Sequence, residues 1–347
     1  MKMKYHLLGR SGLRVSEISL GTMTFGEEWG WGASKEESKR QFDLFVERGG
    51  NFIDTANRYT EGTSEKLVGE FIKSDREKFV LATKYSLSMR KGDVSFSGNS
   101  RKNMVQSLEA SLKRLNTDYV DLYWLHAWDF TTQVDEVMRS LDDMVSAGKV
   151  LYIGISDTPA WIVSMANTLA DFRGWTAFAG LQIEYSLLQR TPERDLLPMA
   201  KALDLAVTPW GALGGGALTG KYSRANNSTD VKGRVAPESA RRSERAMKIA
   251  TVVDQIADET GKKSSQVALN WVRQRNQVMV PIIGARTAEQ LGESLDCVGF
   301  ELTPEQMERL DQVSEIELGF PHDFLMNKPI SDLVYSGLGH QIHNHRR

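Results

Sequence analysis

The chain has 347 residues, and its 41% hydrophobic and 25% charged residues are ordinary proportions for a cytosolic globular protein. Its formal net charge of -2 gives no electrostatic case for a nucleic-acid or anionic-membrane partner. No apolar run spans a bilayer, no apolar segment follows the N-terminal lysines as in a signal peptide, and the lone Cys297 cannot form an internal disulfide. We therefore expect a cytoplasmic protein without nucleic-acid or membrane partners; both a monomer and a homo-oligomer stay open.

Short apolar runs alternate with longer amphipathic runs along the chain. Residues 5–15 come first, and the glycines between their apolar residues predict a β-hairpin at the bottom of the fold. Eight strands are then expected at 18–25, 51–54, 79–84, 119–126, 150–156, 180–185, 205–210 and 278–283. Helices are expected at 34–48, 64–73, 101–115, 134–147, 161–169, 193–203, 245–260 continuing into 264–275, and 287–298.

This alternation predicts an α/β fold of one domain over residues 1–347, a (β/α)8 TIM barrel with its core at about 16–310. Strands separated by helices pair in parallel and are buried on both faces, as apolar runs such as 80–82 indicate. An open doubly wound sheet is the alternative, but no G-x-G-x-x-G follows the first strand. A long loop at 223–243 follows strand seven, and the tail 319–347 is expected to wrap over the barrel mouth or to be partly disordered.

Polar residues end several of these otherwise apolar strands. Active sites of such barrels lie at the C-terminal ends of the strands. Strand two ends in Asp54 with Tyr59 in the next loop, strand three ends in Lys84, and strand four ends in His126. Because buried charges cost desolvation free energy unless they pair, we expect Asp54 and Lys84 to form a pair.

A tyrosine beside a lysine suits proton transfer. The ammonium group of Lys84 is expected to lower the pKa of Tyr59 toward neutrality, where a general acid–base group works well. His126 can donate a hydrogen bond to a substrate carbonyl oxygen. None of these residues is an obvious nucleophile and the protein supplies no hydride, so a cofactor must supply it.

Six ordered segments resemble the aldo-keto reductase family. They comprise Asp54-Thr55-Ala56-Asn57-Arg58-Tyr59 with Gly62, Ser64-Glu65 and Gly69; Thr83-Lys84; Leu125-His126; Gly154-Ile155-Ser156; Gln182-Ile183-Glu184-Tyr185-Ser186; and Pro281-Ile282-Ile283-Gly284-Ala285-Arg286. The match extends from about Gly9 to Leu310. The stretch from Trp210 to Tyr222 is similar to the bacterial and fungal aryl-alcohol dehydrogenase-like branch.

The resemblance implies an NADPH-dependent reduction of aldehydes or ketones, with aromatic or sugar-like aldehydes favoured. Tyr59 would be the proton donor, Lys84 and Asp54 its supports, and His126 the group that orients the carbonyl. Ser156 and Gln182 would bind the carboxamide, and Arg286 the 2′-phosphate. The whole set implied to contact the cofactor is Gly21, Thr22, Asp54, Ser156, Gln182, Trp210, Gly211, Leu213, Gly214, Gly216, Lys221, Gly284, Arg286, Gln290, Glu293 and Ser294.

Two positions depart from the family pattern: Asp157 and Ser294 each stand where many members have Asn. A carboxylate at Asp157 accepts but cannot donate a hydrogen bond, which puts one carboxamide contact in doubt. The small-molecule carbonyl substrate is expected to meet an apolar pocket, formed by Trp29, Trp31, Tyr85 and Trp128.

Other interpretations remain open. Asp54 and Lys84 could form only a structural ion pair, Lys84 could form the Schiff base of a barrel aldolase, or the chain could be a cofactor-binding module like the channel-associated β subunits. No metal is expected, and the histidines at 340, 343 and 345 are interpreted as a solvated tail rather than a metal site.

Overall fold

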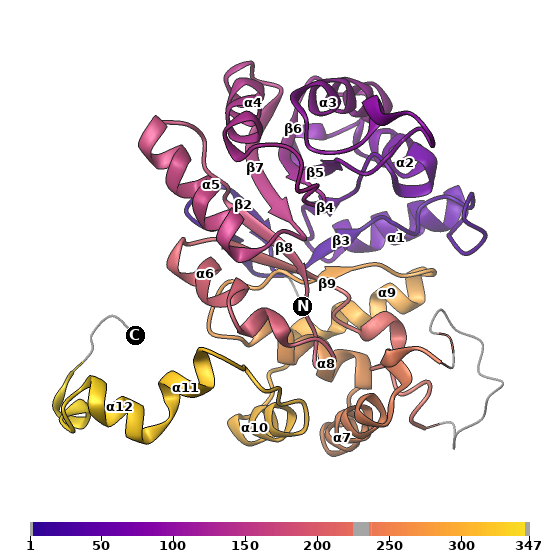
Figure 1. The fold of residues 1–347 in the computed structure, drawn as a ribbon. Coiled ribbons are helices and arrows are strands. Elements are labelled where there is room, and N and C mark those ends of the chain that lie inside the picture. Colours follow the sequence, from indigo (N-terminus) through magenta and orange to yellow (C-terminus); the bar gives the residue numbers. More distant parts are fainter. Residues whose placement is uncertain (1–2, 225–235, 237, 344–347) are drawn as a thin grey trace.

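The computed structural model describes residues 3–224, 236 and 238–343, and its centre is a barrel of parallel strands (Figure 1). The strands follow the order β10-β3-β4-β5-β6-β7-β8-β9. A bridge between Val207 and Met279 closes the ring, with Val207 N donating to Val278 O at 2.9 Å. The strands are β3 (Ser19–Gly21), β4 (Phe52–Asp54), β5 (Val80–Tyr85), β6 (Val120–Leu125), β7 (Val150–Ser156), β8 (Gly180–Glu184), β9 (Ala206–Trp210) and β10 (Ile282–Ile283). The predicted TIM barrel is confirmed.

Helices surround the barrel and bury their apolar faces against it (Figure 1). They are α1 (Lys35–Glu47), α2 (Thr63–Ile72), α3 (Arg101–Leu115), α4 (Val134–Ser146), α5 (Ala160–Arg173), α6 (Leu196–Ala202), α7 (Glu244–Thr260), α8 (Ser264–Arg273), α9 (Ala288–Leu295) and α10 (Pro304–Val313). Local signals set their ends: Ser34 and Ser100 cap α1 and α3 through their side chains, and left-handed Gly174 and Gly261 end α5 and α7. None of the described helices combines the length and apolar character that crossing a bilayer requires.

The bottom of the barrel is plugged by the predicted hairpin, β1 (Tyr5–Leu7) and β2 (Arg14–Ser16). Leu8 and Val15 are fully buried and pack with Phe52 and Val80 in the barrel interior. Gly9 has a φ of +52° and touches the barrel so closely that a Cβ would lie 2.4 Å from the Ala179 carbonyl oxygen. A glycine is therefore required at this turn.

Trp124 fills the middle of the barrel. Its ring is fully buried and faces two glycines on the next two strands. A Cβ added to Gly154 would lie 2.3 Å from the ring, and one added to Gly180 would lie 2.9 Å from it. The small residues on β7 and β8 therefore make room for one large residue on β6, directly below the layer that contains the strand-end polar groups.

Three segments differ from the sequence-based expectation. The first and last strands are shorter than the predicted ranges 18–25 and 278–283. The chain forms parallel ladder pairs there only over β3 and β10. The tail does not lie over the barrel mouth: it forms α11 (His322–Met326) and α12 (Lys328–Val334), which extend away from the barrel (Figure 1). Much of the expected loop 223–243 (residues 225–235 and 237), together with His345, lies outside the described residues.

Candidate active site

Lys84, fully buried in the barrel, lies at the centre of a polar cluster at the C-terminal ends of the strands. Its Nζ forms an ion pair with Asp54 and donates to the Tyr59 hydroxyl at 3.0 Å and to the Thr55 carbonyl oxygen at 2.9 Å. Gln182 Nε2, from β8 across the barrel, donates to the other carboxylate oxygen of Asp54 at 3.0 Å. The cluster therefore unites residues from β4, β5, β8 and the loop after β4, and each donor of the ammonium group has a partner.

The electrostatics of this cluster keep the tyrosine protonated. Burial raises the pKa of Tyr59 above its ordinary value, and although the charge of Lys84 opposes this shift, it does not overcome it. Burial alone would lower the pKa of Lys84, but Asp54 and Tyr59 outweigh it and leave the pKa above its ordinary value. The predicted pairing of Lys84 with Asp54 and Tyr59 is present, whereas the predicted fall in the tyrosine pKa is not. The phenol is thus in the form that can give a proton.

In the described part of the chain, His126 and Ser156 each have a buried polar atom without a partner. The ring of His126 meets that of Tyr59 edge-on, with centroids 6.0 Å apart. Burial, followed by the charge of Lys84, holds the pKa of His126 well below its usual range, so its imidazole is neutral. Among the described residues, His126 Nδ1 and Ser156 Oγ are buried without a hydrogen-bond partner. Because buried polar atoms are nearly always satisfied, these two point to a polar ligand at this place.

The loop between β3 and α1 is bonded to the loop that carries the tyrosine. Trp29 Nε1 donates to Glu61 Oε1 at 3.2 Å, and the Thr60 hydroxyl donates to the Phe25 carbonyl oxygen at 2.6 Å. The rings of Trp29 and Trp31 lie 5.6 Å apart and are half-buried. The two tryptophans expected in a substrate pocket therefore form one aromatic pair attached to the loop that contains Tyr59.

Asp129 organises the loop between β6 and α4. Its carboxylate accepts from the backbone N–H groups of Asn99, Thr131 and Thr132, which brings its pKa to about 2 against the opposing effect of burial. The flanking Trp128 is half-buried and Phe130 is 71% exposed. Sequence reasoning missed Asp129, although an Asp two residues before a threonine pair, as in Asp129-Phe130-Thr131-Thr132, is typical of such a turn.

Tyr85 does not lie with the other expected pocket residues. It follows Lys84 on β5, so its side chain points to the opposite face, where its ring stacks on Tyr123 at 5.2 Å between centroids. It is fully buried, and its hydroxyl lies 3.5 Å from the Asn99 carbonyl oxygen. The alternation of side chains along a strand explains this position and was available in the sequence.

Two contacts at the ends of β7, β8 and β9 were not predicted. Trp210 Nε1 donates to Asp157 Oδ1 at 3.1 Å, so the carboxylate that replaces the usual amide holds an indole ring. Glu184 pairs with Arg241, which follows the long segment after β9, at 2.5 Å. Only the path of the loops brings these partners together, so no local sequence signal identifies them.

The glycine-rich turn after β9 is a compact structure. Gly214, Gly215 and Gly216 have φ values of +58°, +67° and +102°, a left-handed run that other residues rarely adopt. The amides of residues 214 and 216–219 donate to carbonyls of residues 211–216. Of the residues expected to hold a pyrophosphate here, Gly211, Leu213, Gly214 and Gly216 build the turn, and half-buried Lys221 follows it.

The segment after β10 exposes a cation. Arg286 is exposed, and the described residues place no carboxylate in an ion pair with it. Its backbone N–H donates to Gln290 Oε1 at 3.2 Å, Glu293 is exposed, and Ser294 is buried. A guanidinium without an acidic partner fits a phosphate ligand.

Gly21 and Gly284 lie opposite each other between β3 and β10. A Cβ on Gly284 would lie 3.2 Å from the Gly21 carbonyl oxygen, and one on Gly21 would lie 2.6 Å from the Ile282 side chain. The Thr22 hydroxyl donates to the Asp54 carbonyl oxygen at 3.1 Å. A polar cofactor above the Lys84 cluster would fit these observations. It would meet the polar groups beside Gly21 and Gly284 and the unpartnered atoms of Ser156 and His126.

The comparisons with known proteins agree with this architecture. The sequence model described as the Aldo/keto reductase family matches residues 17–315. A norsolorinic acid reductase of Aspergillus flavus is 37% identical over 337 residues, covering 94% of this chain and 85% of that protein. An aryl-alcohol dehydrogenase [NADP(+)] of Phanerodontia chrysosporium is 36% identical over 347 residues, covering 95% and 90% of the two chains.

A putative aryl-alcohol dehydrogenase of Saccharomyces cerevisiae is 36% identical, covering 92% of this chain and 88% of that protein. The predicted resemblance is therefore confirmed over nearly the whole chain. From the family match and the relatives together, the chain belongs to the aldo/keto reductase family of oxidoreductases and is similar to its aryl-alcohol dehydrogenases.

Proposed function

We propose that the chain reduces aldehydes or ketones to alcohols with NADPH, and that Tyr59 is the proton donor. The observation that carries the proposal is the buried Lys84 ammonium group between the Asp54 carboxylate and the Tyr59 hydroxyl, with the unpartnered His126 and Ser156 atoms beside it. Reduction of a carbonyl to an alcohol takes one proton and one hydride. The protein itself offers the proton, from the Tyr59 hydroxyl.

The chain's residues have distinct tasks in this reaction. When bound, NADPH supplies the hydride. Tyr59 gives its proton to the carbonyl oxygen, and Lys84, already within hydrogen-bond distance, stabilises the phenolate that remains. The neutral imidazole of His126 donates a hydrogen bond to the same oxygen and adds no positive charge that would compete with Lys84. Ser156 and Arg286 are the groups we assign to the carboxamide and the 2′-phosphate of the cofactor.

The aldolase alternative is less compatible with the site. A Schiff base forms on a neutral amine, whereas Asp54 and Tyr59 keep the pKa of Lys84 above its ordinary value despite burial. The aromatic side chains beside the site, namely Trp29, Trp31, Trp128 and Phe130, favour a flat aryl aldehyde over a sugar-like one.

Replacing Tyr59 by Phe tests the proton donor. Loss of a general acid costs roughly 10²- to 10⁴-fold in rate, so we expect kcat for an aryl aldehyde to fall by that factor while NADPH still binds. The assay follows NADPH absorbance with aryl, aliphatic and sugar aldehydes, beside cofactor fluorescence titration. Tyr5→Phe, at the barrel bottom, is the matched control and should retain full activity. Tight NADPH binding without turnover by the wild type would instead support the binding-module alternative.

Replacing Arg286 by Ala tests the choice of cofactor. A charge-assisted hydrogen bond contributes about 1.5–3 kcal/mol, so the Kd for NADPH should rise roughly 10- to 100-fold. The Kd for NADH should stay unchanged, because NADH has no 2′-phosphate. Arg14→Ala, exposed on the bottom hairpin, is the control. An unaltered preference for NADPH would remove Arg286 from the cofactor site.

A further inference from the structure

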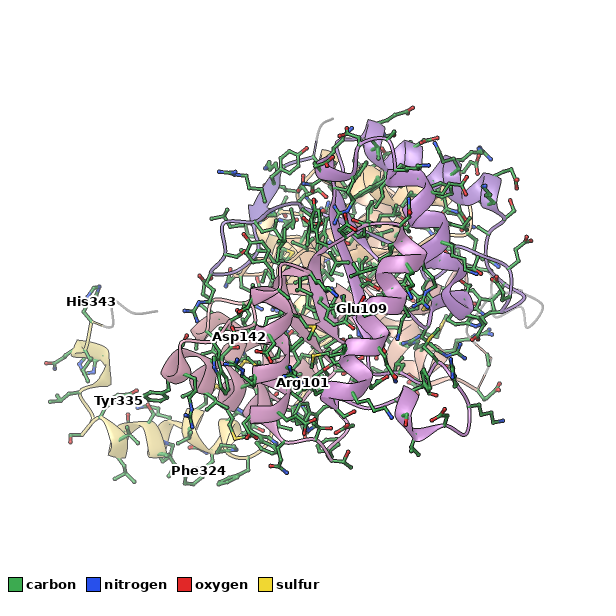
Figure 2. The ribbon with its side chains drawn as sticks, turned by 90° about the horizontal axis from the view of Figure 1, so that it is seen from above. Arg101, Glu109, Asp142, Phe324, Tyr335 and His343 are labelled. Atoms are coloured by element: carbon green, nitrogen blue, oxygen red, sulfur yellow. The ribbon has the colours of Figure 1, made fainter. Side chains whose placement is uncertain are left out.

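The C-terminal arm, residues 319–343, carries apolar side chains into solvent. Nine large apolar side chains between residues 320 and 342 are more than a third exposed, among them Phe320 at 85%, Leu333 at 77% and Met326 at 64%. The view from above shows the labelled Tyr335 and His343 on a segment that projects away from the barrel, with Phe324 nearer its edge (Figure 2). Within the described part of the chain, no hydrogen bond or ion pair joins residues 320–343 to the barrel.

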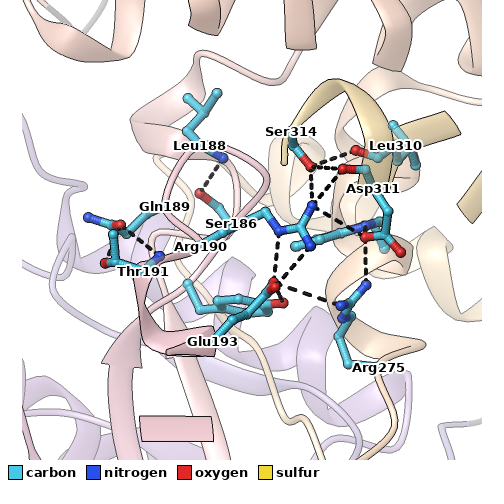
Figure 3. Close-up of polar contacts among 12 residues, drawn as sticks. Ser186, Leu188, Gln189, Arg190, Thr191, Glu193, Arg275, Leu310, Asp311 and Ser314 are labelled. Carbon is cyan, nitrogen blue, oxygen red and sulfur yellow. Dashed lines mark hydrogen bonds and ion pairs between the residues drawn. The ribbon is translucent and has the colours of Figure 1, made fainter. Parts of the chain in front are cut away.

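The root of the arm, in contrast, is firmly attached. Buried Arg190 donates to Glu193 at 2.8 Å and, at the end of α10, to the Asp311 carbonyl oxygen and the Ser314 hydroxyl, both at 2.8 Å (Figure 3). Arg194 donates to the Glu317 carbonyl oxygen at 2.7 Å. The chain is therefore held in one place up to the residues just before the arm, and the arm leaves the barrel from a fixed point.

The arm cannot be stable without a partner surface. Its helices α11 and α12 have 5 and 7 residues, and isolated helices shorter than roughly 12 residues are marginal in water. The Lys328–Asp332 ion pair on α12 is exposed and adds little. Exposed apolar side chains on short helices therefore require a further apolar surface, and the chain's own barrel does not provide it.

A second unpartnered apolar surface lies on the outer face of α5. Trp161, Met165 and Phe172 are 64%, 45% and 86% exposed, and with Thr168 they follow one another at helical spacing. This stripe contains no charge, although Arg10 and Asp171 form an ion pair at one end of the helix. The outer faces of other barrel helices carry charges instead, such as Lys39 and Arg40 on α1, Arg101 and Lys102 on α3, and Glu136 and Arg139 on α4.

We propose that two copies of this chain form a two-fold dimer in which the C-terminal arm of each copy packs on the α5 stripe of the other. A fully exposed aromatic side chain offers roughly 150–250 Å², so the nine partly exposed side chains of one arm offer on the order of 900 Å². Two such arms and the surfaces they cover exceed the roughly 1,600 Å² of a standard stable interface. The exchange also closes on itself, because each copy contributes one arm and one stripe.

The test measures the mass in solution by sedimentation and light scattering. Wild type should have twice the chain mass of 38.9 kDa at micromolar concentration. Leu333→Asp on the arm and Met165→Asp on α5 should each give the mass of one chain, and the circular dichroism should lose no more than the small contribution of the arm helices, because both sites are exposed and outside the barrel core. Val94→Asp, at a position that is 88% exposed and outside both surfaces, is the control and should stay dimeric.

Mixing the two monomeric variants identifies the contact. The Met165→Asp chain has an intact arm and the Leu333→Asp chain has an intact stripe, so together they should form a dimer through one arm–stripe contact, weaker than that of wild type. A monomeric wild type at 100 μM, or a Met165→Asp chain that remains fully dimeric because the arms contact only each other, would overturn the proposal. The measurement is independent of catalysis, so it stands apart from the proposed function.

Discussion

At the residue scale, the site depends on one buried charge with a complete set of partners. Lys84 has no exposed surface, and its ammonium group is satisfied by Asp54, Tyr59 and the Thr55 carbonyl. Removing one partner of such a pair leaves the other buried and unpaired, which costs more than the pair itself contributes.

Lys84→Met should therefore lower the free energy of unfolding by about 3–5 kcal/mol and abolish reduction. The double variant Asp54→Asn, Lys84→Met removes the unpaired carboxylate, so it should regain most of the stability and none of the activity. Urea unfolding beside the NADPH assay separates these effects. Equal stabilities of the single and double variants would show that Asp54 is not left unpaired by the single change.

His126 links stability to pH. Its pKa in the folded state is held well below the ordinary value, first by burial and then by Lys84, so the unfolded chain binds this proton more readily. The neutral His126 side chain therefore contributes fully to stability above about pH 6.5, the approximate pKa of an unperturbed histidine. This contribution is lost as the pH falls from there toward the lower pKa of the folded state.

Wild type should therefore lose stability between pH 6.5 and pH 5 more steeply than His126→Gln, by at most about 1.4 kcal/mol per pH unit. The measurement is the urea midpoint at several pH values. His6→Gln, in the hairpin at the barrel bottom, serves as the control. Parallel pH profiles for wild type and His126→Gln would mean that the imidazole is already accessible to protons in the folded state.

At the scale of elements, complementary side-chain sizes on neighbouring strands shape the barrel interior. Gly154 on β7 and Gly180 on β8 leave the space that Trp124 on β6 occupies. A methyl group at residue 154 would lie 2.3 Å from the indole, so the ring or a strand has to move. Trp124 is paired in register with Lys84 on the neighbouring strand. Gly180 lies two residues before Gln182, so the movement would reach both of these polar residues.

Gly154→Ala should thus destabilise the barrel by about 1–3 kcal/mol through overpacking, and should lower kcat through the displaced lysine. Adding Trp124→Phe should restore part of the stability. Gly12→Ala is the matched control, because nothing lies within 4 Å of the added Cβ and its φ is not in the left-handed region. Thermal unfolding of wild type, Gly154→Ala, Trp124→Phe and the double variant measures the coupling, and additive effects of the two changes would exclude the steric explanation.

At the scale of the whole molecule, the sequence is sufficient to predict the barrel. Apolar runs bounded by turns locate every strand to within a few residues, since a strand buried on both faces is apolar over most of its length. The position of the polar cluster around Lys84 can be predicted as well, because the C-terminal ends of the barrel strands converge regardless of the path of the loops. The pairing of Lys84 with Asp54 and Tyr59 needs no further information.

Some features could not be predicted from the sequence, because they depend on the path of the loops or on the degree of burial of a side chain. Asp157–Trp210 and Glu184–Arg241 join residues 53 and 57 positions apart, and nothing local marks them as partners. The direction of the Tyr59 pKa shift depends on whether burial or Lys84 dominates, which composition does not reveal. The course of the C-terminal arm depends on what it packs against, so the primary structure of one chain shows only that it is apolar.

The hairpin plug closes one end of the barrel, so the polar cluster around Lys84 can be reached only from the other end. Leu8 and Val15 close the plugged end and Trp124 occupies the level above them, so a small molecule that reaches Lys84 must leave by the opening through which it came. Water displaced by an incoming molecule has to leave by the same opening. The product of a carbonyl substrate must therefore depart through the opening before a second substrate molecule can take its place.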